Sequence, residues 1–270
     1  MKNHCFGIVQ GRLTNSPPGQ LQFFPQENWT KEFQIAKEIG LDYIELFAER
    51  EHNSNNPVWS GDGIKKINKL LKDNNLCCDF FCNDYIINHS LKNESCLNQN
   101  LKLIKQCSKF GIKNLVLPFF EESEIEKKDF EEYIKQLRRI YLEAKEYHIN
   151  LLLETSLNAK DLIYFIEILD LEKVGIVYDT GNTISLGHDQ LNDILLLSSL
   201  IKHVHIKDKN TQGQNVLLGS GMVNFYDIFQ ALSSIDYRGC YTFETTRGVE
   251  PIKTSIFNKQ FTEFYIENFN

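Results

Sequence analysis

Four apolar runs in the second half of the sequence each carry an acidic or imidazole side chain near their carboxyl end. These groups are Glu154 in INLLLET, Asp179 in VGIVYDT, His205 in HVHIKDK and Glu244 in CYTFETT. If the runs are neighbouring parallel strands of a barrel, the four groups meet at one rim. Three carboxylates gathered there would repel one another, and a shared cation is the simplest way to keep them all ionised. The pattern therefore predicts a divalent metal site.

One imidazole nitrogen and three carboxylate oxygens form a ligand set that suits Mn²⁺, Mg²⁺ or Co²⁺ and also accommodates Zn²⁺. Any single member of the set has an alternative role, because an acidic residue at a strand end can cap a helix or lie at the surface. Four such residues on four successive strands favour the metal site over four unrelated structural roles.

The elements that must position these groups are visible as eight short runs of β-branched, aromatic or aliphatic residues. The runs begin at residues 6, 41, 77, 113, 149, 174, 203 and 240, so successive starts are separated by 25 to 37 residues. They are almost continuously apolar, which is typical of strands buried on both faces of a parallel sheet. The spacing leaves room for a helix after each strand.

Helical periodicity fills the intervals between the runs. It is clearest over residues 130–147, where apolar side chains recur at steps of three and four. Asn224 is a candidate helix N-cap, and other helices are expected to end at Gly40, Gly111 or Asn150. The alternation predicts an α/β protein, a (β/α)8 TIM barrel formed by residues 1–270 as one domain. An open doubly wound sheet is the structural alternative.

The composition of the chain indicates which partners and which cellular compartment to expect. Twenty-nine Lys and Arg against 36 Asp and Glu give a formal charge of -7, a poor field for a phosphate backbone, so we expect no nucleic acid partner. Seven cysteines without Cys-x-x-Cys spacing indicate reduced thiols, and neither a signal peptide nor a membrane span is expected. We expect a cytoplasmic protein, and assembly into a homo-oligomer is compatible with the sequence.

Seven short motifs resemble the xylose-isomerase-like sugar phosphate isomerase and epimerase superfamily, and together they span almost the whole chain. The motifs are QGRL (10–13), YIEL (43–46), LLLET (151–155), YDTGN (178–182), HVHIKDK (203–209), GSGMVNF (219–225) and TFE (242–244). Each motif is short, but their order and their placement on the predicted strands make the combination specific.

The resemblance implies a metal-dependent isomerase or epimerase of carbohydrate metabolism that acts on a sugar or sugar phosphate. It implies that Glu154, Asp179, His205 and Glu244 hold the metal, and that Glu154 and Glu244, on opposite sides of the substrate, are the proton-transfer pair. In such chemistry one carboxylate removes a proton beside the ketose carbonyl, and a second group returns one to a cis-enediolate. Epimerisation and aldose–ketose isomerisation both fit.

Five further residues are expected to bind substrate oxygens. Glu45 ends the second predicted strand, and its alternative role is to orient a loop. The amide of Asn182 in YDTGN could bind a substrate oxygen, but Gly181-Asn182 could equally be a turn. Lys207 and Lys209 lie near the place where ketose epimerases carry a substrate-binding arginine, and Arg12 has a planar fork suited to an anion. Arg12 could instead pack against the barrel mouth.

The segment Gly219-Ser220-Gly221 precedes a helix in the region where many barrels bind phosphate on backbone N–H groups, but a tight turn explains it equally well. Three other functions stay open. A lyase of the inosose or dehydroshikimate dehydratase type would use the same enolate chemistry. An AP endonuclease is disfavoured by the charge and by the lack of further histidines, and a noncatalytic sugar-binding barrel is disfavoured by the intact ligand quartet.

Overall fold

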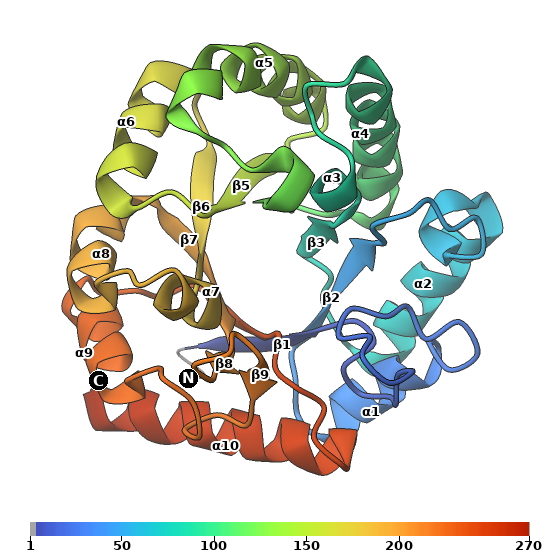
Figure 1. The fold of residues 1–270 in the computed structure, drawn as a ribbon. Helices are drawn as coiled ribbons and strands as arrows, with labels where there is room; N and C mark the ends of the chain where they lie inside the picture. Colours follow the sequence, from blue (N-terminus) through green and yellow to red (C-terminus); the bar gives the residue numbers. More distant parts are fainter. Residues whose placement is uncertain (1–3, 270) are drawn as a thin grey trace. The chain divides into compact units, whose positions relative to one another are not determined.

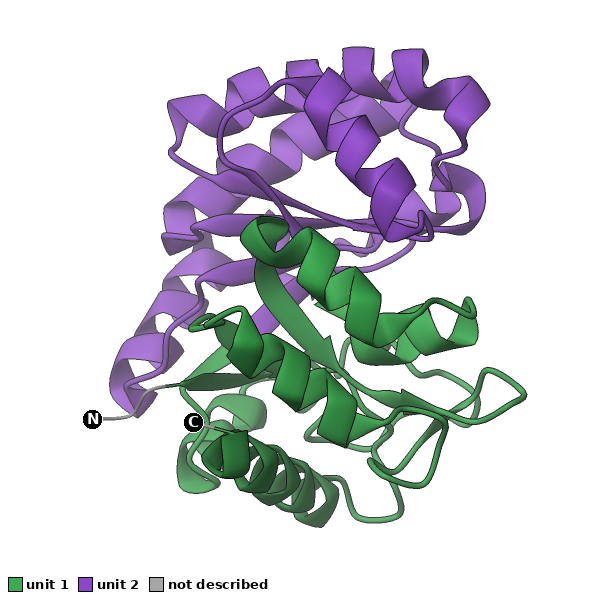
Figure 2. Ribbon diagram, turned by 90° about the vertical axis from the view of Figure 1, so that its left-hand side faces the viewer, with its two compact units in different colours: residues 1–44, 177–270 green, residues 45–176 purple. Residues whose placement is uncertain are grey.

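The computed structural model describes residues 4–269 of the chain (Figure 1). Its eight parallel strands follow the order β1-β10-β7-β6-β5-β4-β3-β2 of a closed barrel, so the predicted (β/α)8 class is confirmed. The chain divides into two compact units (Figure 2). Unit 1 comprises residues 1–44 and 177–270, and unit 2 comprises residues 45–176.

Unit 1 contains the strands that carry most of the predicted site. In register, Gly7 of β1 (Cys5–Val9) lies opposite Thr242 of β10 (Cys240–Phe243), and Thr242 lies opposite His205 of β7 (Ile201–Ile206). The helices of this unit are α1 (Lys31–Glu38), α7 (Thr180–Ser185), α8 (Gln190–Leu197), η5 (Ser198–Leu200), α9 (Phe225–Ser234) and α10 (Pro251–Phe269). Helices α9 and α10 pack together through aromatic side chains, such as the rings of Phe225 and Phe261 at 5.0 Å.

Unit 2 contains the middle strands, which pair in sequence order. Three strands lie entirely within this unit: β3 (Phe80–Asn83), β4 (Asn114–Phe119) and β5 (Asn150–Thr155). Two further strands, β2 (Tyr43–Ala48) and β6 (Val174–Asp179), belong partly to unit 2 and partly to unit 1. The helices of this unit are η1 (Pro57–Trp59), α2 (Gly61–Asn74), α3 (Tyr85–Asn88), α4 (Glu94–Cys107), η2 (Ser108–Phe110), η3 (Glu121–Ser123), η4 (Lys127–Asp129), α5 (Phe130–Glu146) and α6 (Ala159–Leu169).

All eight apolar runs form strands, and the predicted helices follow them. Asn224 caps α9 as expected, because its side chain accepts a hydrogen bond from the N–H of Asp227. The prediction that a helix ends at Asn150 is wrong. Helix α5 ends at Glu146, His148 takes the left-handed conformation with φ 58°, and Asn150 begins β5.

The run HVHIKDK is not one continuous strand. Strand β7 ends at Ile206, and Asp208–Lys209 forms a separate short strand, β8, that pairs antiparallel with β9 (Asn215–Val216). Among residues 4–269, no helix combines the length and hydrophobicity needed to cross a bilayer. Cys78, Cys96 and Cys107 are buried free thiols.

Candidate metal and active site

The side chains of β7 and β10 form two levels because strand residues alternate between faces with a period of two. In the first level, Thr242 Oγ1 lies 2.9 Å from His203 Nε2. In the second level, two residues further along the chain in each case, His205 Nδ1 lies 3.2 Å from Glu244 Oε2. The parallel register that pairs Thr242 with His205 therefore brings the imidazole near the end of β7 beside the carboxylate of Glu244, the first residue after β10.

Lys207 and Asp179 join this second level. Lys207 Nζ lies 2.9 Å from Asp179 Oδ2 and 2.8 Å from Glu244 Oε2, and His205 Nδ1 lies 3.9 Å from Asp179 Oδ2. Asp179, His205 and Lys207 are almost completely buried, whereas the Glu244 side chain is 17% exposed. Two carboxylates, an imidazole and an ammonium thus form one compact cluster within unit 1.

Asp179 has a structural role and a place in the cluster at the same time. Its Oδ1 accepts the N–H of Asn182 at 2.6 Å and caps α7, while its Oδ2 faces Lys207. The hydroxyl of Thr180 donates to the Lys207 carbonyl at 2.6 Å and accepts the Lys207 N–H at 3.0 Å. A Cβ at Gly181 would lie 2.5 Å from Lys207 Cγ, so glycine makes room for the lysine stem.

Charge pairing controls the ionisation of Glu244. Burial raises the pKa of this carboxyl group, but the charge of Lys207, a hydrogen bond from His205 and the charge of Arg12 outweigh burial and hold the pKa well below its ordinary value of 4.5. Glu244 is therefore a carboxylate at neutral pH. A buried carboxylate of this kind is stable only beside positive charge, which is the environment that a cation-binding site provides.

The donor set fits a divalent metal. Asp179, His205 and Glu244 each offer one ligand atom, and these atoms lie within 4.8 Å of one another. Carboxylate oxygens with one imidazole nitrogen are the ligands that Mn²⁺, Mg²⁺, Co²⁺ and Zn²⁺ accept. The ammonium of Lys207 shows where the cluster stabilises positive charge. This acidic and imidazole cluster could bind a metal, and its donors do not select one element.

Arg12 approaches the same cluster from the loop after β1. It is 1% exposed, its Nη2 lies 3.4 Å from Glu244 Oε1, and the same nitrogen donates to Gln22 Oε1 at 2.8 Å. Its Nη1 donates to the carbonyl of Leu21. Arg12 is therefore buried in this loop and brings positive charge to Glu244, while its role in binding a substrate anion stays a prediction.

Two buried charged residues that support this loop were not identified from the sequence. Arg247 donates to the carbonyls of Gly11 at 2.8 Å and Leu21 at 2.7 Å, and burial together with the charge of Arg12 lowers its pKa to about 10. Glu32 accepts the N–H of Gly11 at 2.8 Å. Glu32 lies one helical turn before the buried Ala36 in α1, and this placement on the apolar face is the signal that could have revealed it.

The structure also places the remaining predicted residues. Lys209 Nζ donates to Asn182 Oδ1 at 2.8 Å, so these two substrate-binding candidates meet within unit 1. Glu154 is the penultimate residue of β5 in unit 2. The expectation that Glu45 ends its strand is wrong, because β2 continues for three residues beyond it, to Ala48.

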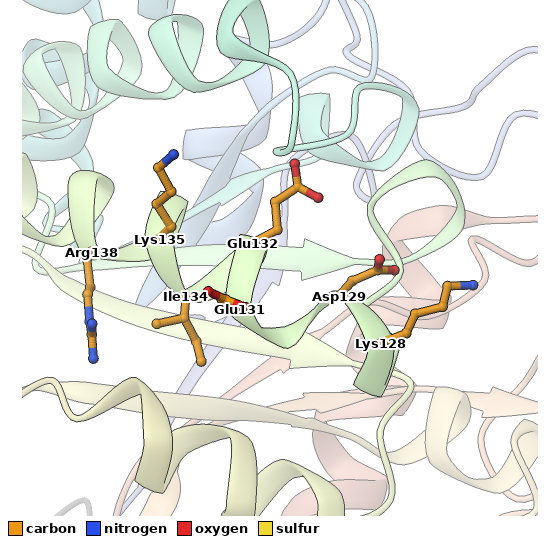
Figure 3. A pocket seen from close by; sticks show the side chains of 7 residues that line it. All are labelled: Lys128, Asp129, Glu131, Glu132, Ile134, Lys135 and Arg138. Atoms are coloured by element: carbon orange, nitrogen blue, oxygen red, sulfur yellow. The ribbon is translucent and has the colours of Figure 1, made fainter.

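A surface hollow of about 630 Å³ lies on α5 and η4 in unit 2, and none of its lining residues is among the predicted site residues (Figure 3). Three basic and three acidic side chains and one isoleucine line it: Lys128, Lys135, Arg138, Asp129, Glu131, Glu132 and Ile134. Charges of both signs on the outer side of a helix are typical of a solvated face. The hollow therefore does not compete with the cluster as the candidate site.

Comparison with known proteins identifies related folds. The family described as xylose isomerase-like TIM barrels matches residues 33–257. An inosose dehydratase from Geobacillus thermodenitrificans is 28% identical over 93 residues, which cover 28% of this chain and 31% of the dehydratase. The match thus spans less than a third of that relative.

Solved structures agree on the fold. D-psicose 3-epimerase from Clostridium cellulolyticum H10, solved with D-tagatose, superposes with a TM-score of 0.76 and 14% identity over 97% of this chain and 99% of its own. A xylose isomerase-like TIM barrel protein from Mycobacterium smegmatis, solved in complex with magnesium, gives a TM-score of 0.72 and 18% identity over 98% and 97% of the two chains. At these identities the likeness establishes the fold alone.

The buried Glu32 makes the stability of the first loop dependent on pH. Burial raises its pKa from 4.5 to about 7, although hydrogen bonds from Gly11 and Leu13 oppose the rise. Protonated Glu32 is therefore favoured by folding, and its contribution to stability is complete below pH 4.5 and lost as the pH rises through 7. Relative to Glu32→Gln, the wild type should lose about 3 kcal/mol of unfolding free energy across this window.

Urea unfolding of both proteins between about pH 4 and 8 measures this difference. Glu38→Gln is the matched control, because Glu38 is exposed in the same helix and the substitution should leave the pH profile unchanged. Parallel pH profiles for the wild type and Glu32→Gln would show that folding does not raise the pKa of Glu32.

Proposed function

Because the chain belongs to the xylose isomerase-like TIM barrel family, we propose that it is a divalent-metal-dependent enzyme that isomerises or epimerises a sugar by proton transfer. The observation that carries this proposal is the cluster in unit 1, where Asp179 and Glu244 both contact the ammonium of Lys207 and the imidazole of His205. The sugar epimerase fold of the structural relatives supports it.

We assign the metal to four ligands, namely Asp179, His205 and Glu244 of unit 1 and Glu154 of β5. Glu154 is included because it lies near the carboxyl end of its strand, where ligands and reactive groups gather in barrels of this class. A bound divalent cation would polarise the substrate carbonyl and acidify the neighbouring C–H bond. Lys207 would leave the position between the two carboxylates when the cation binds, because two positive charges cannot share it.

Glu154 and Glu244 are the proposed proton-transfer pair. One carboxylate takes the proton beside the carbonyl, and the other group returns a proton to the cis-enediolate. In the arrangement observed, the low pKa of Glu244 makes this carboxylate a weak base. Movement of the Lys207 ammonium toward the substrate would place a positive charge beside the enediolate oxygens.

The substrate hydroxyl groups are assigned to five residues. Lys209 and Asn182 already form a hydrogen-bonded pair, which presents an ammonium and an amide together beside α7. Lys207 and Arg12 supply positive charge next to Glu244. Glu45 is retained as a candidate, although its position inside β2 makes it a group of the strand interior rather than of the rim.

A lyase is the second candidate, because the curated relative with the match described above is an inosose dehydratase. Such an enzyme would use the same proton abstraction and then expel a hydroxide from the enediolate as water. The two functions differ in their products. A lyase generates an absorbing enone, whereas an isomerase or epimerase conserves the mass of the sugar and exchanges its carbon-bound proton with solvent.

The ligand assignment is tested first by metal content. His205→Ala should lower the amount of Mn²⁺ retained after dialysis, because the imidazole is a proposed ligand, while the barrel stays folded. His203→Ala is the matched control: His203 lies two residues away on the same strand and bonds to Thr242, so this variant should keep the metal despite some loss of stability. Equal metal content in the wild type and His205→Ala would remove His205 from the site.

The proton-transfer roles are tested by Glu154→Gln and Glu244→Gln at saturating Mn²⁺. Glutamine keeps the shape and a ligating oxygen but is not a base, so each variant should lose about 10²-fold or more in turnover while retaining metal. Solvent deuterium incorporation into a panel of ketoses, followed by NMR, provides the assay. In a two-base epimerase each variant should still exchange the proton on the face served by its remaining carboxylate.

Metal content has to be measured beside the rate, because a variant that loses the ion would lose activity for that reason alone. Wild-type turnover by both metal-loaded variants would restrict Glu154 and Glu244 to metal binding.

A further inference from the structure

The loop before α9 is folded around a carboxylate of the chain itself. Asp208 is completely buried, and its Oδ2 accepts the N–H groups of Gly219 at 3.0 Å and Gly221 at 2.8 Å. Its Oδ1 accepts the N–H of Val223 at 3.1 Å. Three backbone N–H groups therefore converge on one anion, which is the arrangement that barrels of this class offer to a substrate phosphate after strand seven.

The other two N–H groups of this segment are also used. The N–H of Ser220 donates to the carbonyl of Leu217 at 3.0 Å, and the N–H of Met222 donates to the carbonyl of Lys209 at 2.8 Å. All five successive N–H groups from 219 to 223 thus have an acceptor within the chain. An incoming phosphate would therefore have to displace hydrogen bonds that are already made, and Asp208, which is buried, would lose the donors that stabilise its carboxylate.

The glycines of this segment are explained by the same carboxylate. A Cβ at Gly221 would lie 2.3 Å from Asp208 Oδ1, and Gly219 has a φ of +82°. The G-S-G pattern, which resembles a phosphate loop in sequence, is therefore required by the close approach of Asp208 and by the turn.

The beginning of α9 is equally unsuited to an anion. The Oδ1 of Asn224 accepts the N–H of Asp227, and the Nδ2 of Asn224 donates to Asp227 Oδ2 at 2.6 Å. The first turn of the helix consequently carries a carboxylate where a phosphate would need positive potential.

The loop after β10 does not offer an exposed positive side chain that could bind a phosphate instead of these N–H groups. Arg247 donates through Nε and Nη1 to the carbonyls of Gly11 and Leu21, and its Nη2 is buried without a hydrogen-bond partner among residues 4–269. The ammonium of Lys207 lies between two carboxylates, and that of Lys209 contacts Asn182. Each of these three positive side chains thus contacts an oxygen of the chain, and the remaining donor of Arg247 is enclosed within the protein.

We infer that the substrate of the proposed sugar isomerase or epimerase is an unphosphorylated sugar, because Asp208 occupies the position at which this barrel would otherwise hold a phosphate. The inference rests on the proposed function for the identity of the reaction, but the occupation of the loop by Asp208 is independent of it. A neutral sugar needs no anion site, and its hydroxyl groups can be bound by side chains such as Asn182 and Lys209.

The first test compares matched substrates with the Mn²⁺-loaded protein: D-fructose with D-fructose 6-phosphate, and D-ribulose with D-ribulose 5-phosphate. Solvent deuterium exchange should be seen with free sugars. The kcat/KM for each phosphate ester should be lower than that for its free sugar by a factor of about 10² or more, because no hydrogen-bond donors are available to the phosphate group. Faster exchange of a phosphate ester than of its free sugar would overturn the inference. Failure of every sugar in a broad panel would contradict the proposed function instead.

The second test needs no substrate. Thermal unfolding is measured with increasing inorganic phosphate in the wild type, Asp208→Ala and Asp227→Ala. Phosphate should raise the Tm of Asp208→Ala by a few degrees, because the three freed N–H groups can bind it, and should leave the wild type and Asp227→Ala unchanged. Stabilisation of the wild type by phosphate that competes with a free sugar would refute the inference, and this result decides the matter even if Asp208→Ala does not fold.

Discussion

Lys207 places an ammonium between the carboxylates of Asp179 and Glu244, and the local structure of unit 1 follows from that placement. Charges removed from water are stable only when they are closely paired, so neither carboxylate nor the ammonium could occupy this position alone. The two hydrogen bonds of Thr180 hold the Lys207 backbone beside α7, and the lack of a side chain at Gly181 lets the lysine stem pass. The same electrostatic pairing that satisfies the lysine also prepares the carboxylates for a divalent cation.

Buried charges organise the surrounding loops in a similar way. Asp208 folds the segment that precedes α9, while Glu32 and Arg247 fasten the segment after β1 that carries Arg12 toward Glu244. Asp208, Glu32 and Arg247 are all hydrogen-bonded to backbone N–H groups or carbonyls, and these bonds fix the loops. The cluster is therefore bordered by loops in which most donors and acceptors are already paired, and this restricts which substrates fit.

Much of this architecture could be predicted from the sequence, because strand burial and helix periodicity leave direct traces in residue order. The strands that carry Asp179 and His205 were located correctly, and so was the strand before Glu244, although it ends one residue earlier than predicted. Asp179 is both a helix cap and a member of the cluster. Pairing is harder to predict, since it depends on three-dimensional neighbours. Residue order alone did not show that Asp208 accepts the N–H groups of the G-S-G segment, or that Arg247 reaches Leu21. The short β8–β9 ribbon was missed for the same reason.

The central claim is that the cluster around Lys207 binds a divalent cation at the position that the Lys207 ammonium occupies in this structure. Calorimetric titration of Mn²⁺ into the wild type, Lys207→Met and Lys202→Met tests it directly, because Lys202 is an exposed lysine on β7, the strand that immediately precedes Lys207. Removal of the competing charge should tighten Mn²⁺ binding in Lys207→Met by at least about tenfold, with Lys202→Met close to the wild type. Unchanged or weaker binding in Lys207→Met, or no Mn²⁺ binding by any of the three proteins, would contradict the account.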